Sequence, residues 1–164
     1  MRDAAYTAAG MAAAFVLSSL VGRLSPALVL SFNLLSVVVL YAAVRKGEVY
    51  GAVTGMLCGL LQDAFSIGVF GVAGIAKTLA GFAAGSVAKK INIASFSRRY
   101  SFFAAVLILE LAVWAFLYTA VFSQRVYTAG GLIFLQPFLT ALAAVGIFPL
   151  GRWLNRFLEK RKKA

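Results

Sequence analysis

Three charged residues lie inside long apolar runs, and they are the side chains best placed to do chemistry: Asp63, Lys77 and Glu110. Counted along the expected helices at about 1.5 Å per residue, Lys77 and Glu110 lie roughly 16 Å and 15 Å from the nearest basic loop. Because these depths match, we predict a buried Lys77–Glu110 ion pair. An unpaired charge at this depth is costly, so each side chain should face the bundle interior or water. The pair is interpreted first as structural, with a part in a proton or ligand pathway as the alternative.

Asp63 lies about sixteen residues along its expected helix, or roughly 24 Å, and a glycine-punctuated connection follows it. Two interpretations stay open. In one, Asp63 ends a helix and meets water at the outer interface. In the other, an ordered re-entrant turn shapes an outward-facing pocket or docking surface, since irregular backbone at this depth must be buried in protein or line a wet cavity. The polar residues expected in the same outer half are Asn33, Gln62, Asp63, Ser66, Gln124 and Gln136.

The small number of residues that commonly act in catalysis argues against an enzyme. The chain has no His, five Asp and Glu residues, and one Cys. Histidine is the commonest general base and metal ligand, so its absence removes most familiar active sites. Cys58 lies in an apolar run, where a packing role is favoured over a reactive thiol. We therefore expect no enzyme activity, no cofactor and no metal site.

The elements that position these residues are apolar helices. Hydrophobic residues make up 62% of the 164 residues and charged residues only 13%, too few charges to cover a soluble domain. A bilayer core of about 30 Å needs about 20 apolar residues as a helix. We predict an all-α integral membrane fold with a six-helix transmembrane domain over 1–151 and a basic tail over 152–164. The expected spans are 4–22, 26–44, 49–62, 70–88, 100–122 and 132–151, of which 49–62 is a short third helix ending in a re-entrant-like loop.

The excess of positive charge indicates orientation. There are 16 Lys and Arg residues against 5 Asp and Glu residues, for a net charge of +11, which in a soluble protein would suggest nucleic acid. Here the cations lie between apolar runs, so we expect no nucleic acid partner. Thirteen of them fall at the termini and the even-numbered connections, and only Arg23 and Arg125 fall on the other side. Both termini are therefore predicted to be cytoplasmic.

The end of the chain has the pattern of a membrane-surface helix. Apolar residues share one helical face, and such a face lies on an anionic inner leaflet when cations occupy the other. A topology anchor is the favoured interpretation, with contact to a cytoplasmic partner as the alternative. The basic residues are Arg152, Arg156, Lys160, Arg161, Lys162 and Lys163.

Small residues recur every four positions on three expected helices. On one helical face, this spacing lets two helices approach backbone to backbone. Packing within the bundle is the favoured interpretation, and a groove left for a partner helix is the alternative. The glycines are Gly47, Gly51, Gly55 and Gly59 on the third helix, and Gly81 and Gly85 on the fourth; Ala4, Ala8 and Ala12 form a similar row on the first, beside Ala5, Ala9 and Ala13.

Residues 41–85 carry a family resemblance. The segment Gly55-Met56-Leu57-Cys58-Gly59-Leu60-Leu61-Gln62-Asp63, followed by Gly71-Val72-Ala73-Gly74, resembles the bacterial rod shape-determining protein MreD family. Phe70 departs from it, because the family often has Leu before the glycine. The resemblance implies a scaffold of the cell-elongation complex in the bacterial cytoplasmic membrane, which helps to determine cell shape and organise peptidoglycan synthesis. The implied partners are an MreC-like single-span membrane protein and, directly or through it, the peptidoglycan polymerase and transpeptidase.

The same resemblance supplies the alternative function. The six-helix arrangement of MreD is similar to the substrate-binding subunit of energy-coupling-factor vitamin transporters. A vitamin-binding subunit needs an outward cavity with several convergent polar or aromatic groups. The outer-half polar residues named above are a modest set for that purpose, so the scaffold is preferred.

Overall fold

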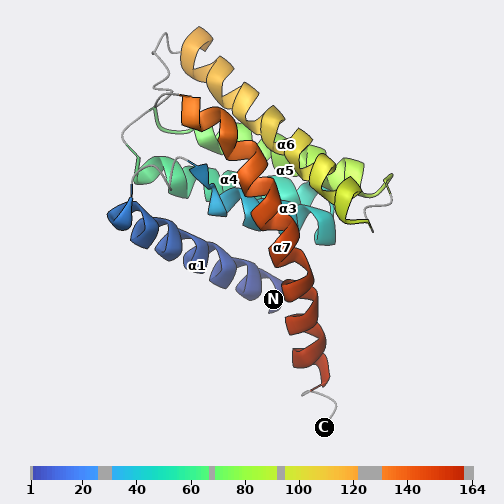
Figure 1. Ribbon diagram of the computed structural model, residues 1–164. Coiled ribbons are helices and arrows are strands. Elements are labelled where there is room, and N and C mark those ends of the chain that lie inside the picture. The colour runs from blue at the N-terminus through green and yellow to red at the C-terminus, as the bar shows by residue number, and fades with distance from the viewer. Residues whose placement is uncertain (1, 26–30, 67–68, 92–94, 122–130, 161–164) are drawn as a thin grey trace.

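The structure, a computed structural model, describes residues 2–25, 31–66, 69–91, 95–121 and 131–160. Within these ranges all regular secondary structure is helical (Figure 1). Each of the six predicted spans has one counterpart among the α-helices. They are α1 (Arg2–Leu24), α3 (Leu34–Lys46), α4 (Glu48–Ala64), α5 (Val72–Ala88), α6 (Phe96–Phe116) and α7 (Leu132–Lys160), with the π-helical turn η1 (Leu117–Val121) continuing α6.

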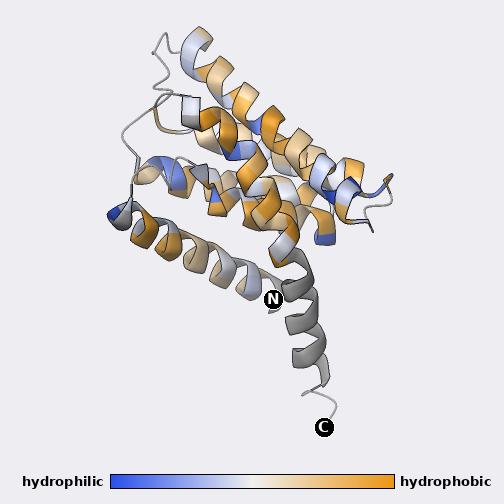
Figure 2. Ribbon diagram, viewed as in Figure 1, coloured by the Kyte–Doolittle hydropathy of each residue, from blue (hydrophilic) through white to orange (hydrophobic). Residues whose placement is uncertain are grey.

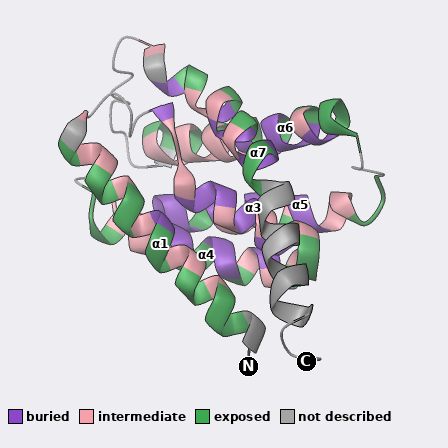
Figure 3. Cartoon of the chain, turned by 60° about the horizontal axis from the view of Figure 1, so that its bottom comes forward, coloured by how far each residue is buried: buried purple, intermediate pink, exposed green. Residues whose placement is uncertain are grey.

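The helices pack side by side in a bundle. The most extensive contact joins α4 to α5, while α3 packs on α4, α5, α7 and α1. Helix α1 lies at the side of the bundle, mainly against α3 (Figure 1). The start of α1 and the end of α7 lie at the same end of the molecule (Figures 1 and 3). The predicted topology, with both termini on one side, requires this arrangement.

Two helices are long and apolar enough to cross a membrane unaided, Ala4–Arg23 and Phe96–Ala120. Val72–Ala88 and Ile133–Ile147 are shorter apolar helices, and α3 has only 13 residues. Figure 2 shows that apolar residues dominate the described helices and that hydrophilic residues gather mainly toward the helix ends. The described residues therefore contain two full-length candidate spans, fewer than the six expected.

The second predicted span is wrong as one continuous helix over 26–44. Helix α3 begins at Leu34, and Phe32 and Asn33 are not helical. The side chain of Asn33 accepts a hydrogen bond from the N–H of Ser36 at 3.3 Å, which is how an asparagine caps a helix N-terminus. The break places a polar amide in the middle of an apolar run. Residues 26–30 of that prediction lie outside the described residues.

The prediction that Gly47 belongs to the glycine row of the third helix is wrong. It lies between α3 and α4 with φ of 94°, and its N–H donates to the carbonyl of Ala43 at 2.9 Å. Positive φ favours glycine, so Gly47 lets the chain reverse directly from one helix into the next. Helix α4 then runs from Glu48 to Ala64, longer at both ends than the predicted 49–62.

The last two helices extend further than predicted at the end of the bundle where α1 begins. Helix α6 begins at Phe96 instead of residue 100, and α7 continues to Lys160 through the predicted boundary between residues 151 and 152. The basic tail lies at the edge of the described residues. The backbone of Arg152, Arg156 and Lys160 is helical, while their side chains and all of Arg161, Lys162 and Lys163 lie outside the described residues.

The core forms where α3 meets its neighbours. One cluster joins α3, α5, α6 and α7 around Leu40, Phe103 and Val145, and a smaller one joins α1, α3 and α4 around Val39 and Cys58. Cys58 is fully buried, consistent with a packing role. Figure 3 shows buried residues on the facing sides of α3, α4 and α5, while α1 is largely exposed or intermediate. Helix α1 is thus the most weakly packed of the described helices.

Candidate functional site: a polar cavity above a buried ion pair

The predicted ion pair is present at the base of the site. The Nζ atom of Lys77, in α5, lies 2.5 Å from Oε1 of Glu110, in α6. Lys77 also donates to Oγ of Ser36 at 2.5 Å, and Ser36 donates to the same Glu110 oxygen at 2.8 Å. Lys77 is only 1% exposed, whereas Glu110 is 12% exposed. A lysine buried this deeply needs its charge paired and hydrogen-bonded, and the α3 serine completes that environment.

Asp63 has a different role from Lys77 and Glu110. Its Oδ2 atom accepts hydrogen bonds from the N–H groups of Gly71, Ala73 and Gly74 at 2.9, 3.0 and 3.2 Å. These are the unpaired donors at the start of α5, where a negative charge is favourable. The carboxylate at the end of α4 therefore fixes the start of α5. Lys77 makes no hydrogen bond to Asp63 and bonds to Glu110 and Ser36 instead.

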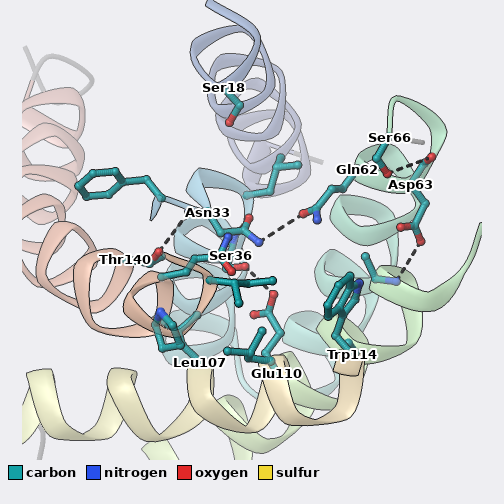
Figure 4. A pocket seen from close by; sticks show the side chains of 18 of the residues that line it. Ser18, Asn33, Ser36, Gln62, Asp63, Ser66, Leu107, Glu110, Trp114 and Thr140 are labelled. Carbon is teal, nitrogen blue, oxygen red and sulfur yellow. Dashed lines mark hydrogen bonds between the residues drawn. The ribbon is translucent and has the colours of Figure 1, made fainter. Parts of the chain in front are cut away.

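A cavity of about 550 Å³ lies among α1, α3, α4, α5, α6 and α7 (Figure 4). Both Glu110 and Asp63 line it. Five of the six outer-half polar residues also meet there, while Gln124 lies outside the described residues. The five are Asn33, Gln62, Asp63, Ser66 and Gln136.

Hydrogen bonds join three helices across the cavity wall. The side-chain amide of Asn33 donates to Oε1 of Gln62 at 3.3 Å, and the backbone N–H of Asn33 donates to Oγ1 of Thr140 at 3.0 Å (Figure 4). The break before α3 therefore has a purpose in the structure. It exposes an amide and a backbone donor that tie α3 to α4 and to α7.

The sequence interpretation missed several lining residues. Ser36, Trp114, Tyr118 and Thr140 all line the cavity, and the rings of Trp114 and Tyr118 are stacked with centroids 5.0 Å apart. A signal was available in the spacing. Trp114 and Tyr118 follow Glu110 at intervals of four residues, and Thr140 follows Gln136 by four. Residues spaced in this way share one helix face, so the positions of Glu110 and Gln136 predict that these three residues face the same side.

The glycine rows lie behind the cavity, where α4 meets α5. A methyl group at Gly55 would overlap the backbone carbonyl of Lys77, and one at Gly59 would overlap that of Ala73. Gly51 and Gly81 face each other in the same way, and Gly85 lies against the backbone at Gly47 and Glu48. These glycines therefore bring the two backbones into direct contact. We call this contact the α4–α5 seam; its glycine faces are occupied within the chain.

Fold and site define a small helical protein of the membrane-associated class, whose apolar helices enclose a polar cavity. The family model described as rod shape-determining protein MreD matches residues 8–161, so the chain belongs to the MreD family. The resemblance found over residues 41–85 thus extends over nearly the whole chain. Comparison with curated proteins and with solved structures gives no match.

Membership of this family gives the chain a role in determining rod shape. MreD is a shape-determining family and not a known enzyme family. Among the described residues there is no group of three His, Cys, Asp or Glu side chains that could hold a metal ion. The expected likeness to the transporter subunit receives no support, because no solved structure matches.

Proposed function

We propose that this chain is a six-span scaffold of the cell-elongation complex in the bacterial cytoplasmic membrane. It binds an MreC-like single-span membrane protein and, directly or through it, the peptidoglycan polymerase and transpeptidase. The observation that carries the proposal is the family match over residues 8–161. A scaffold needs surfaces for partner helices rather than a catalytic group, and the exposed apolar faces of this bundle supply such surfaces.

The proposed topology places the cavity on the outer side of the membrane. The chain ends and the basic loops lie at one end of the bundle, and the Asp63 end of α4 lies at the other. The short helices α3 and α4 lie within the membrane, packed against neighbouring helices. The non-helical backbone at their ends is tolerated at this depth because its polar groups are buried in protein. The basic tail, through Arg152 to Lys163, then lies on anionic lipids of the inner leaflet.

Cysteine labelling tests this topology cleanly, since Cys58 is the only native cysteine and is fully buried. In a Cys58→Ala background, Ser66→Cys and Ser97→Cys form a matched pair of exposed sites at opposite ends of the bundle. We expect a membrane-impermeant maleimide to label Ser66→Cys in intact spheroplasts. Ser97→Cys should be labelled only after the membrane is permeabilised. Labelling of both, or of neither, in intact cells would contradict six spans with cytoplasmic termini.

Helix α1 offers the best surface for a partner helix. The α4–α5 seam already occupies the glycine rows, whereas the alanines of the α1 row are exposed. Val16, Leu17 and Leu20 continue the same surface and are all more than half exposed. Small residues let a second helix approach closely, and apolar neighbours extend the contact. We therefore assign the single-span partner to this alanine face of α1, defined by Ala5, Ala8, Ala9, Ala12 and Ala13.

Co-purification from native membranes tests the assignment. Ala8→Leu with Ala12→Leu should weaken recovery of the MreC-like protein, because two larger side chains hold a partner helix away. Ala112→Leu, an exposed position on α6, is the matched control and should leave recovery unchanged. Equal recovery with both variants would remove α1 as the docking surface. Recovery of transporter ATPase subunits without cell-wall proteins would overturn the scaffold itself.

A further inference from the structure

We propose that the cavity binds a neutral glycosyl ring, either a free saccharide or the headgroup of a glycolipid. This goes beyond the scaffold function and does not depend on it. The cavity of about 550 Å³ falls within the roughly 300–1,000 Å³ that small-molecule sites occupy.

The charges around the cavity select a neutral ligand. Lys77 lies behind the wall and neutralises Glu110. Asp63 is engaged by three backbone N–H groups at the start of α5. Among the described lining residues there is no lysine or arginine, so a phosphate or carboxylate would enter without a counter-charge. An anion is therefore disfavoured, and a cation meets only carboxylates whose charge is already compensated.

The free hydrogen-bonding atoms match hydroxyl groups. Both bonds to Glu110 arrive at Oε1, and Oε2 accepts none from the described residues. Gln62 uses its carbonyl oxygen to accept from Asn33, which leaves its amide hydrogens for another acceptor. Gln136 also lines the cavity, and its amide makes no hydrogen bond to the described residues. Carboxylate oxygens accept from hydroxyls and amides can do both, so a ring bearing several hydroxyls satisfies this mixture.

Aromatic rings supply the apolar part of such a site. Trp114 and Tyr118 are stacked at an interplanar angle of 23° on the α6 wall, and Phe15 and Phe65 lie 4.6 Å apart, centroid to centroid, on the wall between α1 and α4. A sugar ring has C–H faces that pack on aromatic faces while its hydroxyls point outward to polar groups. The Trp114 N–H and the Tyr118 O–H add polar handles beside that platform.

Tryptophan fluorescence gives a direct readout of binding. The chain has two tryptophans, so Trp153→Phe leaves Trp114 as the sole reporter, and this parent is first shown to unfold at the same temperature as the native chain. The full chain is held in phosphatidylcholine nanodiscs, because maltoside detergents carry sugar headgroups of their own. One arm titrates glucose, N-acetylglucosamine and glucuronate. The other compares nanodiscs with and without monoglucosyl diacylglycerol.

A saturable change in Trp114 emission is expected in at least one arm. A response to free neutral sugars assigns a free saccharide, and a response only to the glycolipid assigns a lipid headgroup. Glucuronate should bind at least about tenfold more weakly than glucose, a factor that corresponds to about 1.4 kcal/mol. No response in either arm, or glucuronate binding as tightly as the neutral sugars, would overturn the proposal.

Two pairs of variants separate the cavity from the rest of the surface. Gln136 lines the cavity, while Phe138 lies two residues away on the exposed side of α7. The first pair of variants is Gln136→Leu and its control Phe138→Leu. Only Gln136→Leu should weaken the fluorescence response, by about tenfold or more. Trp114→Leu and Phe116→Leu form the same pair on α6 and are compared by calorimetry. Unchanged binding in both cavity variants would place any bound sugar elsewhere on the molecule.

Discussion

The α4–α5 seam and the cavity both involve α4 and α5, and they are built on opposite principles. At the seam, glycines bring two backbones together so closely that a single methyl group would overlap a carbonyl. At the cavity, the facing helices stand apart by enough to leave about 550 Å³ lined with amides, hydroxyls and aromatic rings. The seam fixes the position of α4 relative to α5, and both helices also contribute residues to the wall of the cavity.

The ion pair lies where the two regions meet. Lys77 belongs to the seam, because its carbonyl faces Gly55, while its side chain ends at the floor of the cavity beside Glu110. Lys77, the most buried charged residue among those described, therefore lies at the boundary between the packed seam and the open cavity. The free energy of unfolding in detergent or lipid measures what the seam, the ion pair and the cavity each contribute to stability.

The largest effect is expected at the ion pair. Glu110→Gln keeps an acceptor oxygen but leaves the buried Lys77 ammonium without a counter-charge, and should lower the free energy of unfolding by about 3–5 kcal/mol. Lys77→Met should be less harmful, because Glu110 opens to the cavity and can be hydrated there. The double variant Lys77→Met with Glu110→Gln removes both charges, so it should be more stable than Glu110→Gln alone. A double variant no more stable than that single one would refute the pairing.

The next effect tests whether the seam is as tight as its geometry indicates. Gly55→Ala should lower the free energy of unfolding by about 3 kcal/mol, the upper range for overpacking, because the new methyl group meets backbone that cannot rotate away. Gly10→Ala is the matched control on α1, where the nearest atom would be 3.9 Å away. Thermal unfolding of the two purified variants makes the comparison. Similar unfolding temperatures would mean that α4 and α5 can separate without loss.

Asp63 tests the cap at the open end of the seam. Asp63→Ala removes the acceptor of three N–H groups at the start of α5, and loss of such a cap costs about 1–2 kcal/mol. Asp63→Asn keeps one acceptor oxygen but loses the charge, so its effect should be intermediate. Hydrogen exchange of residues 71–74 reports the loss locally. Unchanged protection there in Asp63→Ala would show that the carboxylate serves the cavity alone.

Periodicity in the sequence was sufficient to predict one helix for each expected span, and depth counting was sufficient to pair Lys77 with Glu110. The glycine rows also lay on helices that contact each other, because four-residue spacing fixes a face regardless of the neighbour. What could not be predicted depends on contacts between distant residues. Asn33 lies within an apolar run; it caps the helix through Ser36, and its bonds to Gln62 and Thr140 join distant parts of the chain.

The sequence was sufficient to predict which polar residues belong to the candidate site, but not that they surround one cavity. The outer-half polar residues were identified from depth, yet nothing in their spacing shows that five of them face one cavity. Asp63 was recognised as unusual, but its three N–H donors come from residues eight to eleven positions later along the chain. Such bonds depend on how the connection folds back, which hydrophobic patterning does not encode.

The smallest effect is expected outside both regions, at Gly146 on α7. A methyl group there would meet nothing within 4 Å, and alanine favours a helix over glycine by about 0.8–1.0 kcal/mol. Gly146→Ala should therefore raise the unfolding temperature of the isolated chain slightly, in contrast to Gly55→Ala. A lowered temperature would show that this face of α7 packs against something in the isolated state. If the isolated variant is stabilised but recovers less of its partners from membranes, then a partner helix uses the glycine, and α7 joins α1 as a docking surface.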